Sequence, residues 1–252
     1  MKVRKLQQKR GWAFNIGVPI VKSLLFSVST HTWIDGEKLP ATGGCIVVFN
    51  HLSHVDPFMS AHFVYDHGRL PRYLAKSGLF KNKALAGFLT AAGQIPVERL
   101  TRTAIGAYDA AVAAVRAGEC VVVYPEGTLT RDPALWPMTG KSGAARIALE
   151  TGCPVIPVGQ WGAQALLAPY AKTPHLFPRK HVTMKAGDPI DLSDLVALPR
   201  TPDVVQKTTD RIMAALTALV EDIRGETAPP ERFDPRKAGV RQIGNPNKKE
   251  RP

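Results

Sequence analysis

The stretch Cys45-Ile-Val-Val-Phe-Asn-His-Leu-Ser-His-Val-Asp-Pro57 joins a continuous apolar run to a cluster of polar residues. Five apolar residues in succession predict a strand over residues 45–49 that is covered on both faces. The polar cluster follows where this strand reaches the edge of its sheet, and strand ends in α/β folds are where reactive groups meet substrate. His51 and Asp56 lie five positions apart there, and a histidine held by a carboxylate is a base that works near neutral pH.

The same segment has two other interpretations. Asp56 stands directly before a proline, which is typical of a helix N-cap, and His51 would then be an ordinary loop residue. His51, His54 and Asp56 also have the spacing of metal ligands, but such a site needs a further ligand cluster. The sequence offers none, since His62 and His67 have no partner pattern. We therefore predict no metal site.

Strand-like and helix-like segments alternate through the middle of the chain. The predicted strands are residues 45–49, 72–75, 120–124, 154–158 and 181–185. The predicted helices are residues 57–66, 83–90, 104–117, 142–151 and 203–223. This alternation predicts an α/β fold, a single domain with a central mostly parallel or mixed sheet flanked by helices.

The length of 252 residues suits one large domain or two small ones, and a hydrophobic content of 44% is enough for a substantial core. The chain shows neither an internal repeat nor an interior linker. We place the α/β domain at residues 34–225. A basic N-terminal segment, residues 1–33, precedes it, and a basic, proline-rich and irregular tail, residues 226–252, follows it.

The net charge of +12 is concentrated at the two ends, with +5 in residues 1–10 and +4 in residues 231–252. Basic ends suit an anionic surface, either phospholipid or nucleic acid. Aromatic content is only 7% and the bases are not interleaved with aromatic residues, which disfavours nucleic acid. The cysteines Cys45, Cys120 and Cys153 are far apart and lie in or beside apolar runs, which favours buried free thiols over disulfides.

Residues 11–30 contain a single charge, Lys22. Lys22 and Pro19 near the middle make the segment a poor transmembrane span, and it lacks the cleavage site of a signal peptide. A helix that starts at Pro19 would gather apolar residues on one face, namely Val21, Leu24, Leu25 and Val28. Together with the basic prefix, this pattern predicts an amphipathic helix that lies in the membrane interface. A helix that packs on the core is the alternative.

Three further clusters follow the predicted strands or lie between them. They are Gly93-Gln-Ile-Pro-Val-Glu-Arg99, Tyr124-Pro-Glu-Gly-Thr128 and Val155-Ile-Pro-Val158. Alone, each has an ordinary structural interpretation. The first would be an edge strand that ends in a surface arginine, the second a capped loop between a strand and a helix, and the third a strand of the scaffold. The second cluster also carries an acid, hydroxyls and nearby cations after a buried strand, and such a turn can offer backbone amides to a phosphate.

Together and in this order, the four clusters resemble the glycerolipid acyltransferase family typified by 1-acyl-sn-glycerol-3-phosphate acyltransferase. The resemblance covers residues 34–187. The segment from Asn50 to Asp56 matches the family's His-x4-Asp motif, and the other three clusters match its second, third and fourth blocks. There is one departure, because Leu129 stands where the family commonly has an arginine after Glu-Gly-Thr.

The resemblance implies transfer of a fatty acyl group from acyl-CoA or acyl carrier protein to the free hydroxyl of 1-acyl-glycerol-3-phosphate, which gives phosphatidic acid in phospholipid synthesis. His51 would be the base, and Asp56 would fix its tautomer and stabilise the imidazolium. No cofactor is implied. The chain lacks a Gly-x-Ser-x-Gly elbow, which argues against a serine esterase.

The resemblance also implies a pocket for the acceptor's phosphate. Arg99 would hold the phosphate, because a guanidinium pairs with it in bidentate fashion. The other expected members of the pocket are Glu126, Gly127, Thr128, Arg131 and Lys141. Glu126 cannot attract a phosphate by charge, so we expect it to orient Arg99 or an acceptor hydroxyl. Either Arg131 or Lys141 would supply the charge that Leu129 lacks.

The expected partners are lysophosphatidic acid or a related lysolipid, the acyl donor and an anionic membrane surface, with no nucleic acid. The expected location is the cytoplasmic face of the cell membrane, as a peripheral or monotopic protein. The same chemistry on another lysophospholipid, on glycerol 3-phosphate or on a glycolipid is the alternative within the enzyme class. A non-catalytic lipid-binding or nucleic-acid-binding protein is the alternative outside it.

Overall fold

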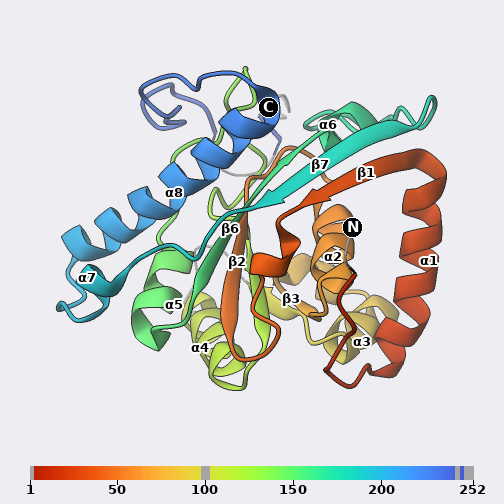
Figure 1. Ribbon diagram of the computed structural model, residues 1–252, viewed down its shortest axis with the longest axis horizontal. Helices are drawn as coiled ribbons and strands as arrows, with labels where there is room; N and C mark the ends of the chain where they lie inside the picture. The colour runs from red at the N-terminus through yellow and green to blue at the C-terminus, as the bar shows by residue number, and fades with distance from the viewer. Residues whose placement is uncertain (1–2, 98–102, 242–244, 247–252) are drawn as a thin grey trace, which may run out of the picture.

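The computed structural model describes residues 3–97, 103–241 and 245–246, which form one sheet with helices on both faces (Figure 1). The sheet has seven strands in the order β1-β7-β6-β2-β5-β3-β4. Neighbouring strands are parallel, except that β6 and β7 are antiparallel. The strands are β1 Ser29–Ile34, β2 Cys45–Phe49, β3 Pro71–Lys76, β4 Ile95–Val97, β5 Cys120–Val123, β6 Val155–Trp161 and β7 Lys180–Ala186. The predicted mostly parallel α/β sheet is therefore confirmed.

The helices alternate with the strands along the chain. They are α1 Trp12–Val28, α2 Asp56–Asp66, α3 Lys83–Ala91, α4 Thr103–Arg116, α5 Gly143–Thr151, α6 Ala163–Leu166, α7 Ser193–Val196 and α8 Pro202–Arg224. Two short 3₁₀ turns, Gly36–Lys38 and Ser77–Phe80, lie between them. The five helices that the sequence predicts outside the N-terminal segment all form, with ends that differ by at most one residue.

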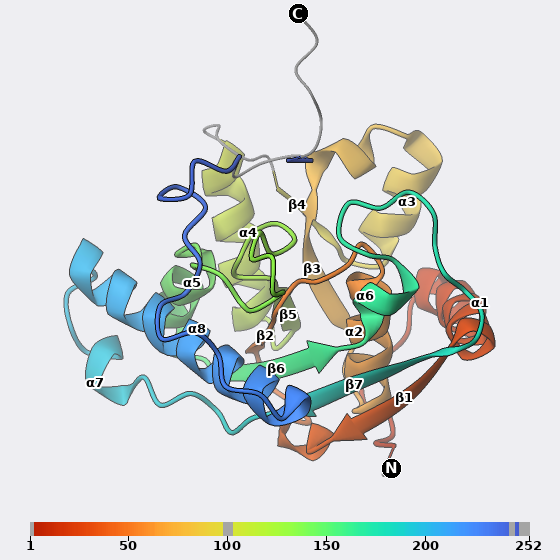
Figure 2. The ribbon, with the colours of Figure 1, turned by 90° about the horizontal axis from the view of Figure 1, so that it is seen from above.

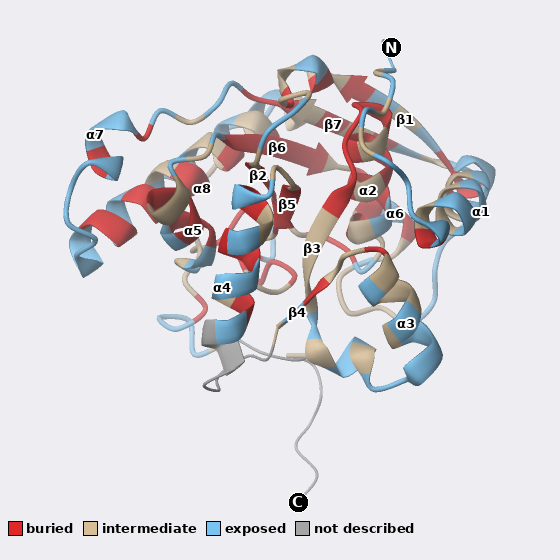
Figure 3. Ribbon diagram, turned by 90° about the horizontal axis from the view of Figure 1, so that it is seen from below, coloured by how far each residue is buried: buried red, intermediate tan, exposed pale blue. Residues whose placement is uncertain are grey.

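Two hydrophobic cores lie on opposite faces of the sheet. On β2, Ile46 and Val48 belong to the core under α4, α5 and α8, while Val47 and Phe49 belong to the core under α1 and α2 (Figure 2). This alternation follows from the two-residue period of a strand, and it explains why a strand covered on both sides must be apolar throughout. Figure 3 shows the buried central strands and the exposed outer surfaces of α1 and α3.

The N-terminal segment differs from the prediction. The helix α1 begins at Trp12 and contains Pro19 in its interior, and it ends at Val28, where the chain continues directly into β1. Leu24 and Leu25 were predicted to lie on one apolar face, but Leu25 is buried while Leu24 is 61% exposed. Within the described residues, we find no helix that combines the length and the apolar character needed to cross a bilayer.

Candidate active site

The polar loop after β2 holds His51 and Asp56 together. Nδ1 of His51 lies 2.9 Å from Oδ2 of Asp56, and the Asp56 side chain is fully buried. The same oxygen accepts the main-chain N–H groups of Leu52, at 2.6 Å, and Ser53, at 2.8 Å. These three contacts fix the carboxylate against the loop. When Nδ1 donates its proton to Asp56, Nε2 carries the free lone pair that a general base requires.

The contacts of Asp56 also decide between two interpretations of the sequence. The N-cap of α2 is Val55, and Asp56 is already the first helical residue. Its carboxylate accepts amides from Leu52 and Ser53, which precede the helix, rather than amides of the helix itself. The N-cap interpretation of Asp56 is therefore wrong, and its carboxylate is built to hold the His51 loop.

Asn50 ties this loop to the end of the neighbouring strand β6. Its side-chain amide donates to the carbonyl of Gln160 at 3.0 Å, and its side-chain oxygen accepts the Gln160 N–H at 2.8 Å. The Gln160 side chain donates in turn to the Asn50 carbonyl at 2.6 Å. Both residues are fully buried, so these bonds fix the direction in which the chain leaves β2. Gln160 was not among the site residues predicted from the sequence, because it lies 110 residues away in the chain.

The loop after β5 supports the His51 main chain from the other side. One carboxylate oxygen of Glu126 accepts the N–H of His51 at 2.8 Å, and the other accepts the N–H of Met138 at 3.1 Å. The carbonyl of His51 accepts the N–H of Thr130 at 2.7 Å. Glu126 is only 1% exposed. Its carboxyl group therefore contacts main-chain amides beneath His51. The expectation from the sequence was that Glu126 orients Arg99 or an acceptor hydroxyl.

Tyr124 packs directly on the ring of His51. Its ring is stacked on the His51 ring, with centroids 4.2 Å apart and an angle of 23° between the planes. The hydroxyls of Tyr124 and Tyr73 each lie 2.7 Å from Oγ of Ser60. Burial raises the pKa of both phenols, so they stay neutral and the network adds no charge beside His51. The stacked ring restricts the rotation of His51.

The remaining residues of the expected phosphate pocket fall into two neighbouring groups. Gly127 has φ of +70°, and a Cβ placed on it would lie 2.8 Å from Cδ of Lys141, so the lysine side chain passes directly over the glycine. Thr128 lies 3.2 Å from the hydroxyl of Tyr170, and the guanidinium of Arg131 lies 4.5 Å from the centre of the Tyr170 ring.

Burial lowers the pKa of Arg131, which is 7% exposed. Leu129, which replaces the family's arginine, is buried. Its side chain is part of the protein interior and contributes nothing polar to the pocket. Arg99 lies outside the described residues. The structure thus brings together Gly127 with Lys141, and Thr128 with Arg131.

Glu126 is expected to make the stability of the fold depend on pH. Burial raises the pKa of Glu126 from 4.5 to about 8, against the opposing effect of its two amide contacts. Between these values the folded state holds a proton that the unfolded state has lost. The free energy of unfolding therefore falls as the pH rises from 4.5 to about 8, by at most about 1.4 kcal/mol per pH unit, and this contribution is constant above that range.

The variant Glu126→Gln lacks the titrating group and should lose this contribution. Urea unfolding of the wild type and the variant at several values between about pH 5 and pH 8 measures the difference. We expect the wild type to lose stability relative to the variant as the pH rises. A difference that does not change with pH would contradict the assignment.

A sequence model of the acyltransferase family matches residues 31–161, which is more than half of the chain and includes the loops after β2 and β5. The chain belongs to the acyltransferase family. It is 29% identical over 133 residues to a chloroplastic 1-acyl-sn-glycerol-3-phosphate acyltransferase of Brassica napus, a match that covers 52% of this chain and 37% of that protein. It is 27% identical over 191 residues to the 1-acyl-sn-glycerol-3-phosphate acyltransferase of Bacillus subtilis, which covers 75% of this chain and 83% of that protein.

The crystal structure of the 1-acyl-sn-glycerophosphate acyltransferase PlsC from Thermotoga maritima has the same fold as this acyltransferase-family chain. The TM-score is 0.59 at 21% sequence identity, over 83% of this chain and 82% of that one. This likeness confirms the α/β architecture. The chain spans about a third of the Brassica napus protein and most of the Bacillus subtilis protein.

Proposed function

We propose that this chain transfers a fatty acyl group from the thioester of acyl-CoA or acyl carrier protein to the free hydroxyl of 1-acyl-sn-glycerol-3-phosphate, giving phosphatidic acid for phospholipid synthesis. The observation that carries the proposal is the His51–Asp56 pair at the end of β2, with Asp56 Oδ2 held by three donors. The names of the relatives from Brassica napus and Bacillus subtilis support the choice of acceptor.

The reaction requires one base and no covalent intermediate on the protein. Nε2 of His51 takes the proton of the acceptor hydroxyl as its oxygen attacks the thioester carbonyl. The C–S bond then breaks, and the leaving thiolate takes the proton from the imidazolium, so that the products are an ester and a free thiol. Asp56 stabilises the imidazolium between these two steps.

The acceptor's phosphate is proposed to bind beside the loop after β5. Gly127 and Thr128 would offer a main-chain amide and a hydroxyl, and Lys141, whose side chain lies over Gly127, would offer its charge. Arg131, held under the ring of Tyr170, is the second cation of this region. Arg99 remains the predicted bidentate partner of the phosphate.

Release of free thiol from acyl-CoA by the purified full chain tests the reaction and its acceptor. We expect thiol release with lysophosphatidic acid, and much less with glycerol 3-phosphate, with other lysophospholipids or with a lyso-glycolipid. A preference for one of these other acceptors would replace the proposed substrate but keep the reaction. If none of the acceptors promoted thiol release, the acyltransferase proposal would fail.

We further propose that α1 lies on the cytoplasmic face of the cell membrane. Four large apolar side chains follow one another at the four-residue spacing of a helix face and are each more than half exposed: Trp12, Ile16, Ile20 and Leu24. An exposed apolar stripe of this kind is typical of a helix that dips into the interface. The basic residues that precede α1 suit the anionic headgroups.

Introducing charge into this stripe should weaken membrane binding. The double substitution Ile20→Glu and Leu24→Glu removes two apolar side chains from the lipid phase, each contributing about 1.5–3 kcal/mol when buried, and adds two negative charges. We expect the affinity for vesicles of anionic phospholipid to fall by about 10-fold or more in a sedimentation assay. Both side chains are exposed, so the fold should not change.

The matched control is Leu198→Glu. Leu198 is 46% exposed and follows α7, which lies on the opposite side of the molecule from α1 (Figure 1). This variant should bind vesicles like the wild type. Equal sedimentation of the double variant and the wild type would contradict the role of α1. Deleting residues 1–30 is a poorer test, because residues 29 and 30 belong to β1.

A further inference from the structure

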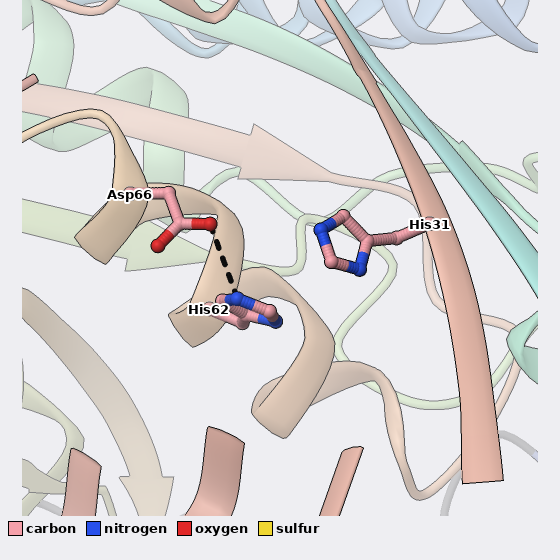
Figure 4. Close-up of side chains that lie close together, drawn as sticks. All are labelled: His31, His62 and Asp66. Carbon is pink, nitrogen blue, oxygen red and sulfur yellow. Dashed lines mark ion pairs between the residues drawn. The ribbon is translucent and has the colours of Figure 1, made fainter. Parts of the chain in front are cut away.

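A second group of ligand-type side chains lies at the far end of α2 from Asp56. His31 projects from the edge strand β1 toward His62 and Asp66 of α2 (Figure 4), and one potential ligand atom from each of the three lies within 4.8 Å of the others. His62 is 3% exposed and Asp66 is 2% exposed. Among the described residues, this is the one group of three or more His, Cys, Asp or Glu side chains with such spacing. The proposed acyl transfer does not use it.

The nitrogen Nε2 of His62 is buried and makes no hydrogen bond to any described residue. It lies 3.1 Å from Oδ2 of Asp66, the contact drawn in Figure 4, so the two atoms are at ion-pair distance without the angles of a hydrogen bond. A buried polar atom without a hydrogen bond costs about 1–3 kcal/mol, so its presence calls for an explanation. Two ligands at about 2.1 Å from one tetrahedral ion lie roughly 3.4 Å apart, which is close to the observed spacing.

The carboxylate of Asp66 is held in place by two neighbours. Its Oδ1 accepts from Lys22 at 2.7 Å, and its Oδ2 accepts from Nε1 of Trp33 at 3.2 Å. Such supporting bonds typically surround metal ligands.

We propose that His31, His62 and Asp66 bind a zinc ion that clamps β1 to α2. Two imidazoles and one carboxylate form a donor set that zinc accepts, with a water molecule as the fourth ligand. Two atoms bound to one ion at about 2.1 Å are at most about 4.2 Å apart. The ring of His31 must therefore turn slightly inward. His31 is partly exposed on an edge strand, and its contacts are ring contacts with Phe26, Trp33 and His62.

These three ligands form no local pattern in the sequence, from which no metal site was predicted. His62 and Asp66 are four residues apart on one helix face, but His31 comes from a strand that was not predicted. The proposed site lies up to ten residues along α2 from Asp56, which is about 15 Å of helix. Zinc there would act on stability, by binding the folded chain and joining the α1–β1 segment to the helix that carries Asp56.

Zinc binding by the tag-free full chain, stripped with a chelator, tests the proposal. Competition with a zinc-sensitive dye gives stoichiometry and affinity, and thermal unfolding gives the stabilisation. We expect one zinc ion per chain and a higher Tm with zinc. The variant His31→Gln should lower the affinity by about 10-fold or more and remove the rise in Tm, because two protein ligands hold zinc poorly.

The matched control is His181→Gln. His181 lies on β7 beside β1, where its ring bonds to Thr30 and Thr32, so its loss removes a neighbouring imidazole outside the proposed site. This variant should bind zinc like the wild type. Absence of stoichiometric binding by the wild type would overturn the proposal, and so would unchanged affinity in His31→Gln. These readouts do not depend on acyl transfer, so they stand apart from the proposed function.

Discussion

Replacing His51 with alanine is expected to lower the rate of thiol release by about 10²-fold or more while the fold remains intact. The hydroxyl of the acceptor is a poor nucleophile at neutral pH, and among the described groups only the His51 imidazole is paired with the buried carboxylate of Asp56. The side chain of His51 is partly exposed and makes one hydrogen bond through its ring. Its loss should therefore change the unfolding midpoint little. Single-turnover rates with acyl-CoA and lysophosphatidic acid, alongside thermal unfolding, measure both effects.

His54→Ala is the matched control for this experiment. His54 lies three residues further along the same loop, but its ring meets the ring of Tyr170, at 6.0 Å between centroids, and makes no contact with Asp56 comparable to that of His51. We expect it to retain most of the activity. Near-normal turnover in His51→Ala, or an equal loss in His54→Ala, would show that the base has been assigned to the wrong residue.

The central strands were predictable because both of their faces are buried. Residues 45–49 and 120–123 must be apolar at every position, since alternate side chains enter the two cores. The strand β1 gives no such signal, because it lies at the edge of the sheet and begins Ser-Thr-His-Thr. Its partner β7 is about 150 residues away, so the pairing that makes it a strand depends on the whole fold.

The candidate site also has one part that could be predicted from the sequence and one part that could not. His51 and Asp56 are close in sequence, and their motif could be recognised from the chain alone. The contacts that hold the loop could not, because Glu126 lies 75 residues from His51 and Gln160 lies 110 residues from Asn50. The motif suggested that Glu126 orients Arg99 or an acceptor hydroxyl, and the hydrogen bonds of its buried carboxyl group add a contact with the main chain of the loop that carries His51.

Substitutions of Asp56 can separate two effects of its carboxylate. One is the negative charge beside His51, and the other is the set of hydrogen bonds that the carboxylate accepts. Its three donors, His51, Leu52 and Ser53, all reach Oδ2, while Oδ1 has no hydrogen bond to a described residue. In Asp56→Asn, the amide oxygen can take the place of Oδ2 and keep all three contacts. Asp56→Ala instead leaves two buried main-chain amides without an acceptor, at about 1–3 kcal/mol for each.

We therefore expect both variants to lower the rate of acyl transfer by about 10²-fold or more, because neither stabilises the imidazolium by charge. Only Asp56→Ala should also lower the free energy of unfolding by several kcal/mol. Rates of thiol release and urea unfolding of the two proteins separate these effects. Wild-type turnover in a correctly folded Asp56→Asn would show that the carboxylate only positions His51, since the asparagine keeps the position and removes the charge.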